Sequence, residues 1–110
     1  MEEKKIVRTC FIGNKDPYEW LLTEDGKATV MPELLIGCEE ILYTDVDEVR
    51  CVRIESFVRR KHNAFDFNVR KKDVADTLEK IMEWGLQEEE YLICERVKNL
   101  QDYIDKQNRF

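Results

Sequence analysis

The sequence predicts a single α+β domain: a curved antiparallel sheet of about six strands, capped by one helix and extended by a second, C-terminal helix. Two observations predict this class. Apolar residues alternate with period two through much of residues 1–72, and after residue 73 they recur at helical spacing. A chain of 110 residues with 43% apolar content seldom holds two separate cores, so residues 1–110 are expected to form one domain.

Six segments carry the strand pattern, and together they give the expected sheet. They are residues 4–12, 18–23, 27–31, 40–43, 49–58 and 64–70. The second and third segments flank the EDG stretch at 24–26, a turn whose glycine suits the positive φ of a tight hairpin. In the last segment Phe65, Phe67 and Val69 alternate with polar residues, which predicts a sheet with one buried face.

Two helices are expected after the sheet. Asp73 is predicted to cap a helix over residues 73–85, and Gly85 is expected to form its left-handed C-terminal cap. A second helix over residues 87–107 carries an apolar seam that can pack back on the domain or pair with a second copy as a short coiled coil. The seam consists of Leu86, Ile93, Val97, Leu100 and Ile104. A homodimer through this helix is therefore one expectation.

The segment from Trp20 to Trp84 resembles the small pleckstrin-homology-like and GRAM-like domains in pattern. Three stretches carry the resemblance: WLLTEDGKATV, ILYTDVDEVRCVRI and FDFNVRKKDVADTLEKIMEW. They look like that family's early hairpin, its strand, acidic turn and strand, and its final strand running into the capping helix. The resemblance implies a strongly bent antiparallel sheet closed at one end by the helix that starts at Asp73. Such domains use the sheet as a platform for lipid head groups or protein segments.

Catalytic and metal-binding residues are nearly absent. The one serine, Ser56, and the one histidine, His62, would lie roughly 20 Å apart on a continuous strand, too far to share a proton. The four cysteines form no CxxC pair and the four glycines are all isolated, so neither a zinc site nor a phosphate-binding loop is predicted. We expect no catalytic residue, metal or cofactor, so an enzyme ranks third among the expected functions, after a protein-binding module and a nucleic-acid-binding module.

Charge is segregated along the chain. The formal net charge is −6, yet residues 50–72 hold eight Lys and Arg against two acidic residues, a net of +6, so the remainder carries −12. Within this segment the candidate binding residues are Arg53, Arg59, Arg60, Lys61, His62, Arg70, Lys71 and Lys72. Arginine guanidinium groups and a histidine can donate hydrogen bonds to phosphate or carboxylate groups. Phe57 or Phe65 could stack beside these basic residues. The alternative interpretation is a charged hairpin that only protects an exposed strand edge from aggregation.

The predicted function is therefore non-catalytic binding, as an adaptor or inhibitor. The hairpin tip at 59–62 is expected to bind an acidic protein segment or an anionic ligand, while the last helix mediates self-association or a second protein contact. The alternative is binding of nucleic acid or a nucleotide through the same hairpin. No run approaches the ~20 apolar residues that a bilayer requires, and the MEEKK start lacks a signal peptide's apolar core. We expect a cytoplasmic protein without membrane insertion.

Overall fold

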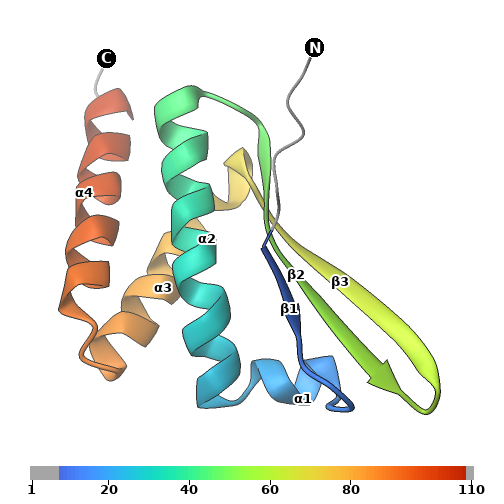
Figure 1. Cartoon of the computed structure of the whole chain (residues 1–110). Coiled ribbons are helices and arrows are strands. Elements are labelled where there is room, and N and C mark those ends of the chain that lie inside the picture. The colour runs from blue at the N-terminus through green and yellow to red at the C-terminus, as the bar shows by residue number, and fades with distance from the viewer. Residues whose placement is uncertain (1–7, 109–110) are drawn as a thin grey trace.

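A computed structural model describes residues 8–108, which fold in the order β1, α1, α2, β2, β3, η1, α3 and α4 (Figure 1). The strands are β1 (Arg8–Phe11), β2 (Glu48–Val58) and β3 (Lys61–Arg70). The helices are α1 (Pro17–Leu21), α2 (Glu24–Thr44), the 3-10 turn η1 (Lys71–Asp73), α3 (Val74–Gln87) and α4 (Tyr91–Asn108). None of the helices in this part of the chain is long and apolar enough to cross a membrane.

Within residues 8–108 the sheet has three strands in the order β1-β2-β3, so the predicted six-stranded antiparallel sheet is wrong. β1 pairs with β2 in parallel, and β2 pairs with β3 in antiparallel fashion. A parallel pair needs a crossover connection, and α1 with α2 supplies it between β1 and β2. The strand predicted at 4–12 survives as β1, although residues 4–7 lie outside the described part of the chain.

The helices pack against one face of the sheet and leave the other uncovered (Figure 1). We call this uncovered side the open face. The register places Thr9, Phe11, Arg50, Arg53, Glu55, Phe57, His62, Ala64, Asp66 and Asn68 on it. The alternation of buried and exposed residues along β2 and β3 agrees with the period-two pattern of their sequences, so these two predicted strands are confirmed.

The predicted early hairpin is wrong, because residues 18–23 and 27–31 lie mainly in the helices α1 and α2. The Asp16 carboxylate accepts a hydrogen bond from the backbone N–H of Tyr18 at 2.9 Å and so caps α1. Pro17 follows at the start of the helix, where its missing N–H loses no intrahelical bond. Asp-Pro is thus a helix start here, and not part of a strand-to-strand loop.

Helix α2 replaces both the predicted turn at 24–26 and the predicted strand at 40–43. The Thr23 hydroxyl accepts the backbone N–H of Gly26 at 3.1 Å, so the EDG stretch forms the first helical turn. α2 packs against the sheet on one side and against α3 and α4 on the other. It is therefore apolar around much of its circumference and lacks the clear period of a surface helix.

The main core lies between the sheet and the layer of α2, α3 and α4. Its buried residues are Leu35, Cys38, Ile41, Val49, Cys51, Val69, Val74, Leu78, Ile81, Val97 and Leu100. Gly37 lies where α2 crosses β2, and a Cβ there would overlap the Cys51 sulfur. Glycine at position 37 therefore permits the short distance between α2 and β2.

A smaller cluster of buried residues packs beneath β1 and α1. Its members are Ile12, Trp20, Val30, Val52 and Ile54.

The helices expected near residues 73–85 and 87–107 are confirmed as α3 and α4, with two corrections at their ends. The Asp73 side chain makes no capping hydrogen bond. Gly85 lies inside α3, where a Cβ would come within 2.8 Å of the Cys94 sulfur, so it permits close approach of α4 instead of ending the helix. The left-handed residue of this connection is Glu89, with φ 57°.

Candidate functional site

A two-residue turn joins β2 to β3 and carries arginine at both positions. Val58 pairs with Lys61 across the turn, and Arg59 and Arg60 have φ values of 51° and 65°. Positive φ at both central residues is the signature of a type I′ turn, which normally selects Asn-Gly or Asp-Gly. A side chain in this left-handed region costs roughly 1–2 kcal/mol per residue relative to glycine. The turn therefore keeps two arginines at the expense of stability.

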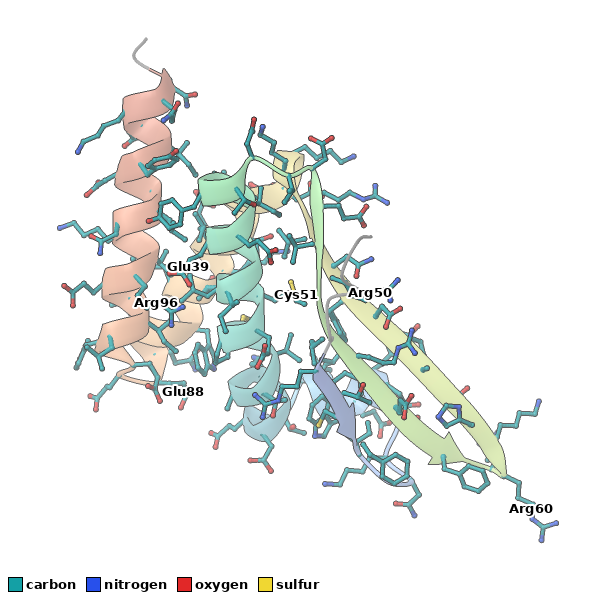
Figure 2. All side chains as sticks on the ribbon, turned by 45° about the horizontal axis from the view of Figure 1, so that its top comes forward. Glu39, Arg50, Cys51, Arg60, Glu88 and Arg96 are labelled. Carbon is teal, nitrogen blue, oxygen red and sulfur yellow. The ribbon has the colours of Figure 1, made fainter. Side chains whose placement is uncertain are left out.

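We call Arg59, Arg60, Lys61 and His62 the hairpin tip. All four are exposed, and Figure 2 shows Arg60 at the far end of the hairpin with its side chain directed away from the helices. Within residues 8–108, Arg59, Arg60 and Lys61 make no ion pair, whereas the His62 Nε2 lies 3.7 Å from the Glu55 Oε2. The tip thus presents three cationic side chains to solvent that no carboxylate in this region neutralises.

Arg53, which the sequence places among the candidate residues, is neutralised on the open face. Its Nε and Nη2 donate to the two carboxylate oxygens of Asp66 at 2.7 and 3.2 Å. The Asp66 carboxylate holds the pKa of Arg53 above its ordinary value, and the Arg53 guanidinium holds the pKa of Asp66 below its own. The Nε of Arg50 also lies 3.8 Å from Asp66. The middle of the open face is therefore close to neutral.

The second basic group lies at the opposite end of β3, and it too is largely paired. The Arg70 Nε lies 3.8 Å from a Glu48 oxygen, and the Lys71 ammonium donates to the Asp45 carboxylate. This bond holds the pKa of Asp45 below its ordinary value and raises the pKa of Lys71. Lys72 alone of these cations makes no ion pair within the described residues. Among the candidate cations within residues 8–108, the unpaired positive charge is therefore clustered at the hairpin tip.

Two exposed phenyl rings lie near the tip on the open face. Phe57 pairs with His62 across β2 and β3 and is 49% exposed, and Phe11 on β1 is 63% exposed. Phe65 faces the helix side instead and meets the Tyr18 ring edge-on, with 5.5 Å between ring centroids. Phe57 and Phe65 were predicted as residues that stack beside the tip, whereas Phe11 was not. The sequence does carry a signal for the exposure of Phe11. Side chains alternate along a strand, so the Cys10 side chain on the helix side places that of Phe11 on the open face.

The apolar seam, predicted either to pack back on the domain or to pair with a second copy, packs within the chain. Val97 and Leu100 are fully buried, and Ile93 and Ile104 pack against the same core. The Arg96 guanidinium on α4 also binds the Glu39 carboxylate on α2 (Figure 2). Of the five seam residues Leu86 is the exception, because it lies on α3 and is exposed. α4 is thus held to the body by its seam.

The described residues offer no catalytic arrangement around the candidate serine. Ser56 is fully buried on the helix side of β2, whereas His62 lies on the open face. The Ser56 hydroxyl has no hydrogen-bond partner in this part of the chain. Cys94 is buried between α3 and α4, and residues 8–108 hold no cluster of His, Cys, Asp and Glu able to bind a metal ion.

Comparison with family models, with curated proteins and with solved structures found no match for the chain. The resemblance to pleckstrin-homology-like and GRAM-like domains therefore gains no support from relatives. The sheet formed by the described residues also differs from the bent antiparallel sheet that it implied, since β1 pairs with β2 in parallel.

Proposed function

We propose that this chain is a non-catalytic interaction module of the cytoplasm that binds an acidic segment of a partner protein through its hairpin tip. The observation that carries the proposal is the pair of arginines in a type I′ turn, both at positive φ and without an ion pair in the described residues. Strained backbone that persists at an exposed position is typical of functional sites, because stability alone would favour other residues there.

Charge supports a local docking site in preference to a broad basic surface. Arg53 and Arg70 are paired with carboxylates of the same chain, so these two candidate cations contribute little net field. Arginine side chains bind carboxylates with two parallel hydrogen bonds, which gives a small basic site both affinity and orientation. The exposed ring of Phe57 adds apolar area beside the tip. These features suit a short acidic peptide segment.

Nucleic acid is the competing ligand, and its phosphate backbone favours a continuous basic stripe. The net charge of −6 and the Arg53–Asp66 pair both oppose such binding over the open face. The two ligand classes separate by their dependence on salt. Affinity for an oligonucleotide should fall steeply and log-linearly with salt, whereas binding that includes apolar contact should fall less.

The test compares the wild-type chain with a double variant in which the charge of the tip is reversed, Arg59→Glu together with Arg60→Glu. The matched control is Lys80→Glu with Lys98→Glu, which makes the same charge change at two exposed positions on α3 and α4. Fluorescence anisotropy is measured with a labelled Asp/Glu-rich peptide and with a labelled single-stranded oligonucleotide at several salt concentrations. We expect peptide binding by the wild type and the control, and its loss in the tip variant. Unchanged binding in the tip variant would reject the proposal.

A pull-down from native cell extract with the same three proteins identifies the natural partner. The relevant partner is captured by the wild type and by the control, and not by the tip variant. If the captured material is instead nucleic acid, with a steep salt dependence, the competing function replaces the proposed one.

A further inference from the structure

We infer that the acidic partner segment binds in extended conformation as a fourth strand along the free edge of β3, with its carboxylates at the hairpin tip. This inference rests on the proposed function and names the mode in which that site binds its partner. The observations that carry it are the directions of backbone groups on β3, the apolar side chains beside its edge and the charges at its two ends.

β3 is the outer strand of the sheet, and its backbone directions follow from bonds on the far side of β2. The Glu55 carbonyl accepts from the Ile12 N–H at 2.9 Å, and the Phe57 N–H donates to the Gly13 carbonyl at 2.7 Å. Both β2 residues thus direct backbone groups away from β3. Antiparallel pairs alternate between bonded and non-bonded, so these residues belong to the non-bonded pairs.

The partners of Glu55 and Phe57 on β3 are Ala64 and His62. In a non-bonded antiparallel pair both residues direct their N–H and C=O groups outward, so those of His62 and Ala64 point to the free edge. The same alternation assigns Asp66 to this edge. Within residues 8–108 no strand or loop pairs with these groups. They form a ready template for an added strand.

Aromatic side chains line the helix side of this edge. The ring of Phe65 meets that of Tyr18, which projects from α1 and is 68% exposed. Alternate side chains of an added strand point to the same side of the sheet as Phe65. Apolar residues at those positions would cover both rings, while the residues between them would lie on the open face. The edge therefore selects a segment with alternating apolar and polar residues.

Charge places the acidic end of that segment at the hairpin tip and argues against a second copy as the occupant. The edge begins beside Arg60 and Lys61, which are unpaired in the described residues, and ends at Arg70, which is paired with Glu48. If β3 of two copies paired antiparallel along its length, the tip cations of one copy would lie close to the basic group at 70–72 of the other, in which Lys72 makes no ion pair within residues 8–108. Like charges directly opposite on paired strands are destabilising. An acidic segment meets no such repulsion.

The experiment uses Ala64→Pro, because proline removes the outward N–H at this position and leaves the bonds to β2 intact. Proline is tolerated on edge strands for this reason. Ala64→Val is the matched control, since valine has a similar volume, keeps the N–H and suits a strand. The probe is the labelled, amidated peptide Val-Thr-Val-Thr-Val-Asp-Glu-Asp, which places its acids at the tip when it pairs antiparallel with β3. The reversed peptide tests parallel pairing.

We expect one of the two peptides to bind the wild type and Ala64→Val equally, and Ala64→Pro about tenfold more weakly, the loss expected for one or two main-chain hydrogen bonds. Thermal unfolding confirms that both variants are folded, and amide exchange of β3 slows on binding. If Ala64→Pro binds as tightly as the wild type while Arg59→Glu with Arg60→Glu does not bind, the tip function stands and strand addition is wrong. Failure of both peptides to bind, or a wild-type dimer that Ala64→Pro dissociates, would also overturn the inference.

Discussion

The Arg53 guanidinium on β2 donates two hydrogen bonds, of 2.7 and 3.2 Å, to the Asp66 carboxylate on β3. The pair neutralises the middle of the open face and leaves the unpaired cations at the end of the hairpin. It also couples the stability of the hairpin to pH, because the pKa of Asp66 is held below its ordinary 3.8 by that guanidinium.

The pH dependence of stability has a definite sign. An aspartate whose pKa is lowered in the folded state contributes stability above its unfolded pKa, and this contribution is lost as pH falls through the lowered value. We therefore expect the urea midpoint of the wild type to fall as pH decreases from 5 to 2. The Asp66→Asn variant lacks this group, so its midpoint should fall less over the same range. Parallel curves for the two proteins would show that the pair makes no contribution.

The close approach of Gly37 to Cys51 predicts that a larger residue at position 37 destabilises the fold. Gly37→Ala places a methyl group against the Cys51 sulfur and should destabilise the fold by about 1–3 kcal/mol in urea denaturation, the usual cost of overpacking. Adding Cys51→Ala should recover part of this loss, because the double variant removes the overlapping atom. A Gly37→Ala protein as stable as the wild type would mean that α2 and β2 lie further apart.

We expect that Ser56 can be replaced without destabilising the fold. Its hydroxyl is fully buried and has no hydrogen-bond partner in the described residues. A buried hydroxyl without a partner carries a desolvation penalty, so Ser56→Ala should leave stability unchanged or raise it by about 1 kcal/mol. Denaturation of the two proteins under identical conditions measures the difference. A clear loss of stability would reveal a bond that Ser56 makes in solution.

The burial of the four cysteines predicts the order in which their thiols react with an alkylating reagent. Burial raises the pKa of the Cys38 thiol to about 12, so it should stay protonated and unlabelled by iodoacetamide at pH 8 in the folded protein. Cys10 is the least buried of the four cysteines and should react first. Mass spectrometry of digested samples follows each site, with a urea-unfolded sample as the control. Early labelling of Cys38 would contradict its buried position.

The sequence alone sufficed for those elements whose pattern is local and strongly periodic. β2 and β3 alternate because only one face of the sheet is covered, and α3 carries a distinct apolar stripe. The basic turn between the strands was also found, since Arg59 and Arg60 separate two alternating runs. These features depend on neighbours a few residues apart, which is the range that periodicity reports.

Local sequence patterns did not predict a residue's environment where that environment depends on distant parts of the chain. α2 is covered on two sides, so its apolar residues gave no single stripe, and Gly26 looked like a turn residue although it permits close packing. The neutralisation of Arg53 by Asp66 depends on the register of two strands, which charge counting along the chain does not contain. Asp16 and Pro17 did carry a local helix signal, and the hairpin interpretation overlooked it.

The most direct measurement replaces the turn with the residues that its backbone prefers, Arg59→Asn with Arg60→Gly, and follows stability and acidic-peptide binding together. Asn-Gly suits a type I′ turn, so the thermal midpoint should rise, while loss of the two guanidinium groups should abolish binding. That combination would show that the arginines are kept for binding at the expense of stability. Binding that survives the replacement, or a lowered midpoint, would contradict the account.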